Sequence, residues 1–173
     1  MTVRRRKTPS KRLADLLGEA MAGNRKIAVM GIGNELRGDD AVGHVIAGDL
    51  SRMQRDRFIS FAVGTAVENA SHLIRRASPR YLFVIDAAQV VSEGKRMRGW
   101  DFFPPESINS FIHSTHSLPL SMLFSIWRRE NPELIVHFIG IPIGPTRDFA
   151  PLSIRAQSIR KQIVAIFTRS LGH

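Results

Sequence analysis

The chain has 173 residues, 43% of them hydrophobic, which suffices for one well-packed core and is too short for two ordinary domains. It contains no cysteine, so disulfides, thiolate metal ligands and a cysteine nucleophile are excluded. The formal net charge is +10, and the longest apolar runs fall far short of the roughly 20 residues of a membrane span, so we expect a cytoplasmic chain with no membrane insertion.

The positive charge is concentrated at the N-terminus. The first 26 residues hold eight Lys or Arg and two Asp or Glu, and so supply six of the ten net charges. VRRRKTPSKR predicts a solvated arm, with adhesion to an acidic protein surface or nucleic acid as the alternative; no aromatic residue interleaves it to stack on bases, so a nucleic-acid partner is not expected. We divide the chain into a basic arm with a short helix at 1–25 and one domain at 26–173, and expect a monomer.

The first half of the chain alternates strand and helix signals. Helical spacing predicts a short helix in RLADLLGEAMA, and the apolar run KIAVMGI predicts a buried strand. AVGHVIAGDLSRM predicts a helix whose apolar face is formed by Val42, Val45, Ile46 and Leu50. Next, RFISFAV, ENASHLIRRA and RYLFVIDA predict a strand, a helix and a third strand that ends near Asp86.

The second half continues this alternation. KRMRGWDFF predicts a short segment at the sheet edge, SLPLSMLFSIWRRE a helix, and ELIVHFIGI another strand. PLSIRAQSIRKQIVAIFTRSL predicts a long final helix with a buried stripe of Ile154, Ile159, Ile163, Ile166 and Phe167. Such alternation indicates parallel βαβ units, so the predicted fold is α/β: a three-layer sandwich with a mostly parallel, twisted sheet of about five strands and helices on both faces.

Three polar positions are predicted to meet where ligands bind in such sheets, beyond the carboxyl ends of the strands. Asp40, with its neighbour Asp39, follows the first strand and opens a helix. Asp86 ends the strand YLFVID, and His116 precedes the helix SLPLSML. If the strands run parallel, all three lie at one edge of the sheet.

A nucleotide site is the first alternative. Gly31 and Gly33 begin a G-x-G-x-x-G pattern, but Leu36 holds the third position, and no G-K-[ST] follows. Two aspartates at a helix N-terminus would repel the phosphate that such a site attracts. The aspartates therefore count against a nucleotide.

A serine triad is the second alternative, because Asp86, His116 and either Ser114 or Ser117 supply the residue types. No G-x-S-x-G elbow accompanies them.

A metal site uses the same residues, since two carboxylates and one imidazole suit first-row divalent ions and leave positions open for water or substrate. The structural alternative is that one aspartate caps a helix and His116 only begins one. The remaining candidates, His44, His72, His113 and His137, have no second ligand at helical spacing and are interpreted as structural.

At these residues the chain resembles the hydrogenase maturation proteases, which remove a C-terminal extension from the nickel-iron hydrogenase large subunit after nickel insertion. The resemblance extends from about Lys26 onward. It is carried by GIGNELRGDDAVG, similar to the family pattern G-x-G-N-x-L-x-x-D-[DE]-x-x-G, by VIDA, and by THSLPL. The closest branch looks like the one that serves formate-linked or energy-converting hydrogenases.

The resemblance implies an endopeptidase, of the aspartic type by family classification, whose partner is the large-subunit precursor. It implies that Asp40, Asp86 and His116 bind metal, with nickel supplied by the substrate and other divalent ions also compatible. It implies catalytic roles for Asp40 and Asp39, and substrate binding by Gly64, Thr65 and Asn34. We expect nickel to report that assembly is complete.

Several positions depart from the family pattern. The glycine after the acidic pair is Ala41, the acid of the D-G-G-[TS] turn is Ala62, and the late G-I-Q-P reads GIPIGP. The basic arm has no counterpart in the family pattern. The altered turn leaves an alternative function: a chaperone or scaffold that binds the precursor without cleaving it.

Overall fold

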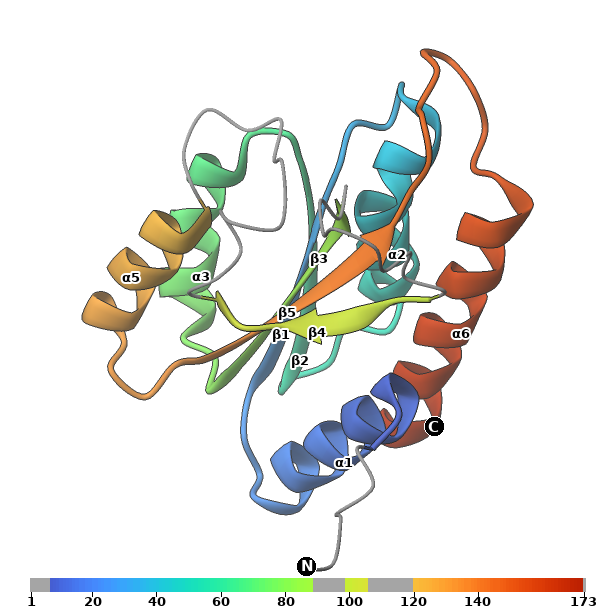
Figure 1. The fold of residues 1–173 in the computed structure, drawn as a ribbon. Helices are drawn as coiled ribbons and strands as arrows, with labels where there is room; N and C mark the ends of the chain where they lie inside the picture. The colour runs from blue at the N-terminus through green and yellow to red at the C-terminus, as the bar shows by residue number, and fades with distance from the viewer. Residues whose placement is uncertain (1–6, 89–98, 106–119, 173) are drawn as a thin grey trace, which may run out of the picture.

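The computed structural model describes residues 7–88, 99–105 and 120–172 and contains one mixed sheet of five strands (Figure 1). Their order across the sheet is β2-β1-β3-β5-β4. The strands are β1 (Ile27–Ile32), β2 (Phe58–Gly64), β3 (Tyr81–Ala88), β4 (Asp101–Phe103) and β5 (Ile135–Pro142). The first three and β5 run parallel, whereas the short β4 pairs antiparallel with β5 at one edge. The predicted α/β fold and the edge position of Asp101–Phe103 are confirmed.

Helices cover both faces of the sheet, as Figure 1 shows. One face carries α1 (Pro9–Ala22), α2 (Val42–Ser51) and α6 (Ile154–Leu171), and the other carries α3 (Ser71–Ala77) and α5 (Leu120–Glu130). Each face has its own apolar core, and every residue of β1 and β3 is buried. Continuous apolar strands are the sequence signature of a sheet covered on both sides. None of the helices in the described ranges is long and apolar enough to cross a bilayer.

Helix α1 belongs to the core of the first face. Thr8 begins it, since its hydroxyl accepts a hydrogen bond from the Lys11 amide at 3.3 Å. Leu13 and Leu17 are fully buried and α1 packs against α6. The helix predicted for RLADLLGEAMA is confirmed, but it begins earlier, so residues 9–12 of the expected solvated arm are helical. The helix lies on the core because burying its leucines is favourable. Residues 1–6 lie outside the described part, and the domain division at residue 25 stays a prediction.

The predicted stripe of α6 needs one correction. Ile159, Ile163, Ile166 and Phe167 are buried as predicted, but Ile154 is 89% exposed. A spacing of five residues turns the helix by about 140°, so Ile154 lies on a different side from Ile159. Ala156, three residues before Ile159, takes the buried position instead.

His137 lies in β5 among aromatic rings, where a structural histidine was predicted. Its ring stacks on Phe83 at 5.1 Å and on Tyr81 at 6.2 Å between centroids. Burial lowers its pKa to about 4, with further lowering by the charges of Arg12 and Arg128. His137 is therefore neutral near pH 7. His44 and His72 lie inside α2 and α3 as predicted, and His113 falls outside the described residues.

Two glycines let α2 lie directly on the sheet. A Cβ atom at Gly31 in β1 would be 2.0 Å from the carbonyl oxygen of Gly43. A Cβ atom at Gly43 would be 2.3 Å from the carbonyl oxygen of Ile85 in β3. Only glycine permits this approach. The first turn of α2 is thereby fixed against the carboxyl ends of β1 and β3.

Candidate functional site

The loop that carries both aspartates leaves β1 through Gly33. This residue has a φ of +146°, and a Cβ atom on it would meet the Asp40 carbonyl oxygen at 2.0 Å. The loop then forms a short 3-10 helix, η1 (Gly38–Ala41), which leads directly into α2. The glycine thus lets the backbone of Asp40 fold back onto the end of the strand. We call residues 34–41 the aspartate loop.

Asp40 is half-buried and is held by its own loop. Its Oδ2 accepts a hydrogen bond from the Asn34 amide at 3.3 Å. The Asn34 side chain accepts one from the Leu36 amide at 3.0 Å, which fixes the turn between them. Among the described residues, Oδ1 of Asp40 has no hydrogen-bond partner. One carboxylate oxygen is therefore oriented by the loop, and the other can accept a ligand.

Asp39 has a different environment. Its Oδ1 accepts a hydrogen bond from the Ser153 amide at 2.6 Å, and its Oδ2 accepts one from the Ser153 hydroxyl at 2.7 Å. Ser153 begins α6, where its hydroxyl accepts from the Ala156 amide at 3.2 Å. Neither aspartate caps η1 itself. Asp39 thus joins the aspartate loop to α6, and of the two predicted catalytic carboxylates the geometry favours Asp40.

Asp86 lies in β3 near its carboxyl end and is only 3% exposed. It pairs in register with Gly140 of β5. The residue before it, Ile85, presents its carbonyl oxygen to Gly43 at the start of α2, and η1 contacts β3. The structure therefore brings the aspartate loop and the Asp86 strand to the same edge of the sheet, as parallel strands require.

The third predicted ligand, His116, lies outside the described residues, as do Ser114 and Ser117 of the serine-triad alternative. Within the described ranges, no group of three His, Cys, Asp or Glu side chains could hold a metal ion. Asp40 and Asp86 supply the carboxylate part of the predicted set. Carboxylate oxygens suit divalent first-row ions, so the donors present fit the predicted metal. The complete three-residue site stays a prediction.

The predicted substrate-binding residues lie beside this loop. Gly64 ends β2 with a φ of +63°, and its carbonyl oxygen accepts a hydrogen bond from the Gly33 amide at 3.1 Å. Thr65 follows it directly. Ala62, which replaces the family acid, is exposed on β2. The Gly64–Thr65 turn and Asn34 therefore flank the same end of β1, although their role in binding stays a prediction.

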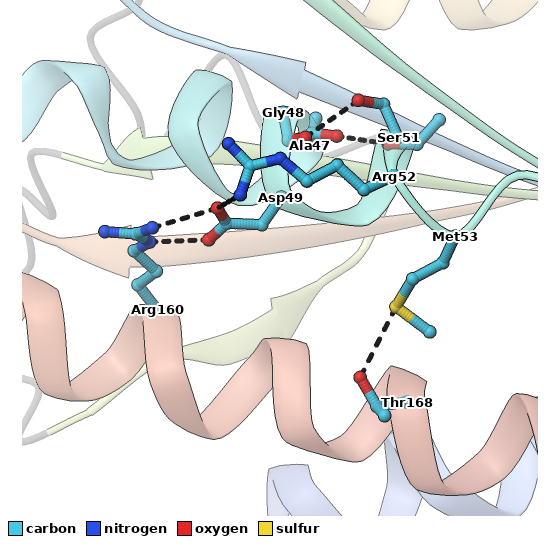
Figure 2. A network of polar contacts seen from close by, with 9 residues as sticks. Ala47, Gly48, Asp49, Ser51, Arg52, Met53, Arg160 and Thr168 are labelled. Carbon is cyan, nitrogen blue, oxygen red and sulfur yellow. Dashed lines mark hydrogen bonds and ion pairs between the residues drawn. The ribbon is translucent and has the colours of Figure 1, made fainter. Parts of the chain in front are cut away.

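A second connection fixes α6 against α2, and Figure 2 shows it from close by. Arg160 donates two hydrogen bonds to Asp49, at 2.6 and 2.9 Å. This hydrogen-bonded pairing with Asp49 raises the pKa of Arg160. Arg52 lies 3.8 Å from the same carboxylate, and the Thr168 hydroxyl donates to the sulfur of Met53 at 3.4 Å. Two-pronged arginine–carboxylate pairing fixes orientation, so α6 is anchored along α2 as well as at Ser153.

Sequence reasoning missed the contribution of the segment before α6. The Phe149 amide donates to the Leu36 carbonyl oxygen at 2.6 Å, and Arg37 lies 3.7 Å from Asp148. Ser153 carried the only available signal, as a serine directly before a helical pattern. That signal predicts a cap and says nothing of Asp39, which is 114 residues away.

Comparison with known proteins gives sequence relatives of one kind, although no family model matches the chain. A protein of Methanocaldococcus jannaschii that is named among the hydrogenase maturation proteases is 28% identical over 150 residues, covering 82% of this chain and 85% of that protein. The hydrogenase 3 maturation protease of Escherichia coli is 26% identical over 141 residues, covering 82% of this chain and 86% of that protein.

Solved structures agree in fold. The [NiFe] hydrogenase maturation protease HycI from Thermococcus kodakarensis superposes with a TM-score of 0.77 at 24% identity, covering 90% of this chain and 98% of that one. A crystal structure of the hydrogenase 3 maturation protease gives a TM-score of 0.68 at 22% identity, covering 82% and 88%. The predicted resemblance is confirmed: the chain is similar in sequence to hydrogenase maturation proteases and has the fold of their solved structures.

Proposed function

We propose that this chain is an endopeptidase that removes the C-terminal extension of a nickel-iron hydrogenase large-subunit precursor after nickel insertion. The observation that carries the proposal is the position of Asp40, oriented by Asn34 at the sheet edge to which Asp86 also comes, in a chain whose relatives are named maturation proteases. The branch that serves formate-linked or energy-converting hydrogenases is part of this proposal.

Asp40, Asp86 and His116 would recognise the nickel that the precursor carries. Burying two carboxylates at an interface is costly unless a cation is present to offset their charge. A precursor without nickel lacks that cation and would bind poorly. Cleavage would thereby depend on completed assembly, with the nickel belonging to the substrate.

Hydrolysis needs one attacking water and one residue to move its proton. In this proposal Asp40 takes a proton from water as the water oxygen bonds to the scissile carbonyl carbon, and the proton then passes to the leaving amine as the C–N bond breaks. Asp39 is the weaker candidate for this role, since both its oxygens accept hydrogen bonds from Ser153. Asp39 would instead position its neighbour.

The test is to incubate the purified chain with nickel-loaded large-subunit precursor and to measure the mass of the precursor's C-terminus. We expect a shortened product from the wild type and a rate at least about 100-fold lower for Asp40→Asn. Asp56→Asn is the matched control, because Asp56 is exposed before β2 at the opposite end of the sheet. Nickel-free precursor should remain uncut.

Two results would overturn the proposal. Normal cleavage by Asp40→Asn would remove Asp40 from the reaction, and equal cleavage of nickel-free and nickel-loaded precursor would remove nickel recognition. Binding of precursor without any cleavage by the wild type would favour the alternative of a chaperone or scaffold. In that case Ala62→Asp would be the first variant to test, because it restores the acid of the family pattern.

A further inference from the structure

The strongest unexplained surface feature is a group of exposed apolar side chains next to the aspartate loop. Among the described residues, the three most exposed large apolar side chains are Leu36 at 60%, Phe149 at 83% and Ile154 at 89%. We call these three the apolar lip. Single exposed apolar residues are common, but the most exposed ones of a chain rarely gather in one place without a partner.

Hydrogen bonds bring the three parts of the apolar lip together. The Phe149 amide bonds to the Leu36 carbonyl oxygen at 2.6 Å, so these residues lie on adjacent segments. Ile154 directly follows Ser153, which bonds to Asp39 at 2.6 and 2.7 Å. In Figure 1 the aspartate loop and the orange segment before α6 lie side by side at the top of the molecule, beyond the strand ends. The apolar lip therefore borders the loop that presents Asp40.

The backbone at Phe149 is itself unfavourable. Its φ is +57°, in the left-handed region that bulky residues avoid and that Gly or Asn adopts more readily. The chain thus places an aromatic ring in water on a strained backbone. Folding gains nothing from this arrangement, and such outliers gather at binding sites. Strain and exposure at the same residue point to a bound state in which the ring is covered.

Charged side chains of both signs surround the apolar lip, so its apolar side chains decide what can cover it. Arg37 has only a long contact of 3.7 Å with the exposed Asp148. Arg147 is exposed and forms no ion pair with any described residue. Glu35 and Asp148 are exposed beside these two arginines, so the charges balance and the surface matches a segment that offers apolar side chains.

We propose that the apolar lip is the docking surface for the protein substrate, and that it takes an apolar segment close to the scissile bond. The proposal rests on the proposed function. Because Leu36 shares the aspartate loop with Asp40 and Phe149 bonds to Leu36, a chain that covers both side chains is held beside the reacting carboxylate. The docked segment would thus bring the scissile bond to Asp40 and hold it there.

The test compares cleavage of nickel-loaded precursor by the wild type and by Phe149→Asn. We expect KM to rise about tenfold, which corresponds to about 1.4 kcal/mol of binding, while kcat changes by less than about twofold. Asn is at ease at positive φ, so the melting temperature should stay constant or rise. Opposite effects on affinity and stability separate a docking residue from a structural one.

Two further variants complete the experiment. Leu36→Ser should also raise KM, since it removes a second part of the lip. Met21→Ser is the control: Met21 is 38% exposed on α1, at the other end of the molecule, and should leave KM unchanged. Unchanged KM in both lip variants would overturn the docking proposal.

Binding is measured in parallel by titrating fluorescently labelled precursor. If the wild type binds but does not cleave, the proposed function fails, and the lip is judged by whether Phe149→Asn weakens binding about tenfold. Absence of any binding by the wild type overturns both proposals. The oligomeric state is measured by sedimentation. If the wild type is a dimer that Phe149→Asn converts to a monomer while KM is unchanged, the lip binds a second copy of this chain. That result would overturn substrate docking.

Discussion

The two ends of helix α6 differ in what they contact. Toward its C-terminus, Ile163, Ile166 and Phe167 are buried, and Phe167 meets the rings of Phe58 and Phe83 at 6.0 and 5.7 Å between centroids. At its N-terminus, Ser153 bonds to Asp39 and Ile154 points into water. One end therefore supports folding, and the other supports the aspartate loop. Substitutions at the two ends should affect different measurements.

The largest expected effect is at the buried end. Phe167→Ala removes a fully buried ring and should lower the free energy of unfolding by about 3–5 kcal/mol, measured by urea denaturation. Ile154→Ala, at the exposed end, should change it by less than about 0.5 kcal/mol. If both variants lost a similar free energy of unfolding, the two ends of α6 would not differ as the structure indicates.

The second largest effect is expected from acid, which should lower the free energy of unfolding through His137. His137 has a folded pKa of about 4 against 6.5 in the unfolded chain, so between these values the unfolded state binds more protons. The stability lost through His137 should therefore reach about 2 kcal/mol as the pH falls from 7.5 to 5. Urea curves at both pH values measure it. His137→Phe should remove most of the dependence; an unchanged slope in that variant would assign it to other groups.

A smaller loss of stability is expected where α6 meets the aspartate loop. Ser153→Ala removes the cap and one of the two hydrogen bonds to Asp39, and should cost about 1 kcal/mol. If the loop positions Asp40, kcat should fall about tenfold with little change in KM. Ser153→Thr keeps the hydroxyl and should restore both values. If Ser153→Ala lost stability but not kcat, Ser153 would only cap α6 and would not position the aspartate loop.

The fold was predictable because burial leaves a direct trace in sequence. The apolar strand runs, the five-strand estimate and the edge position of Asp101–Phe103 all follow from local patterns. Ile154 was misplaced because apolar character alone does not say which side of a helix faces the core, and Ala156 fills the stripe with a smaller side chain. The docking of α1 was missed for the same reason: a pattern shows an apolar face without naming what it packs against.

The candidate site was predictable only in part. Parallel strands put the aspartate loop and Asp86 at one edge, which the order of elements predicts. The different environments of Asp39 and Asp40 were not predictable, since they depend on Ser153, far away in sequence. The positive φ of Phe149 and its contact with Leu36 likewise arise from tertiary structure. His116 remains a prediction from sequence.

The glycine contacts among β1, α2 and β3 also constrain how this chain can evolve. Gly31 and Gly43 accept no side chain unless α2 moves. Single substitutions at these two glycines therefore cannot shift the aspartate loop gradually relative to the sheet. Leu36, Phe149 and Ile154, by contrast, face solvent and can be exchanged one at a time. A lineage built on this frame can therefore vary these exposed apolar side chains while the carboxylates keep their places.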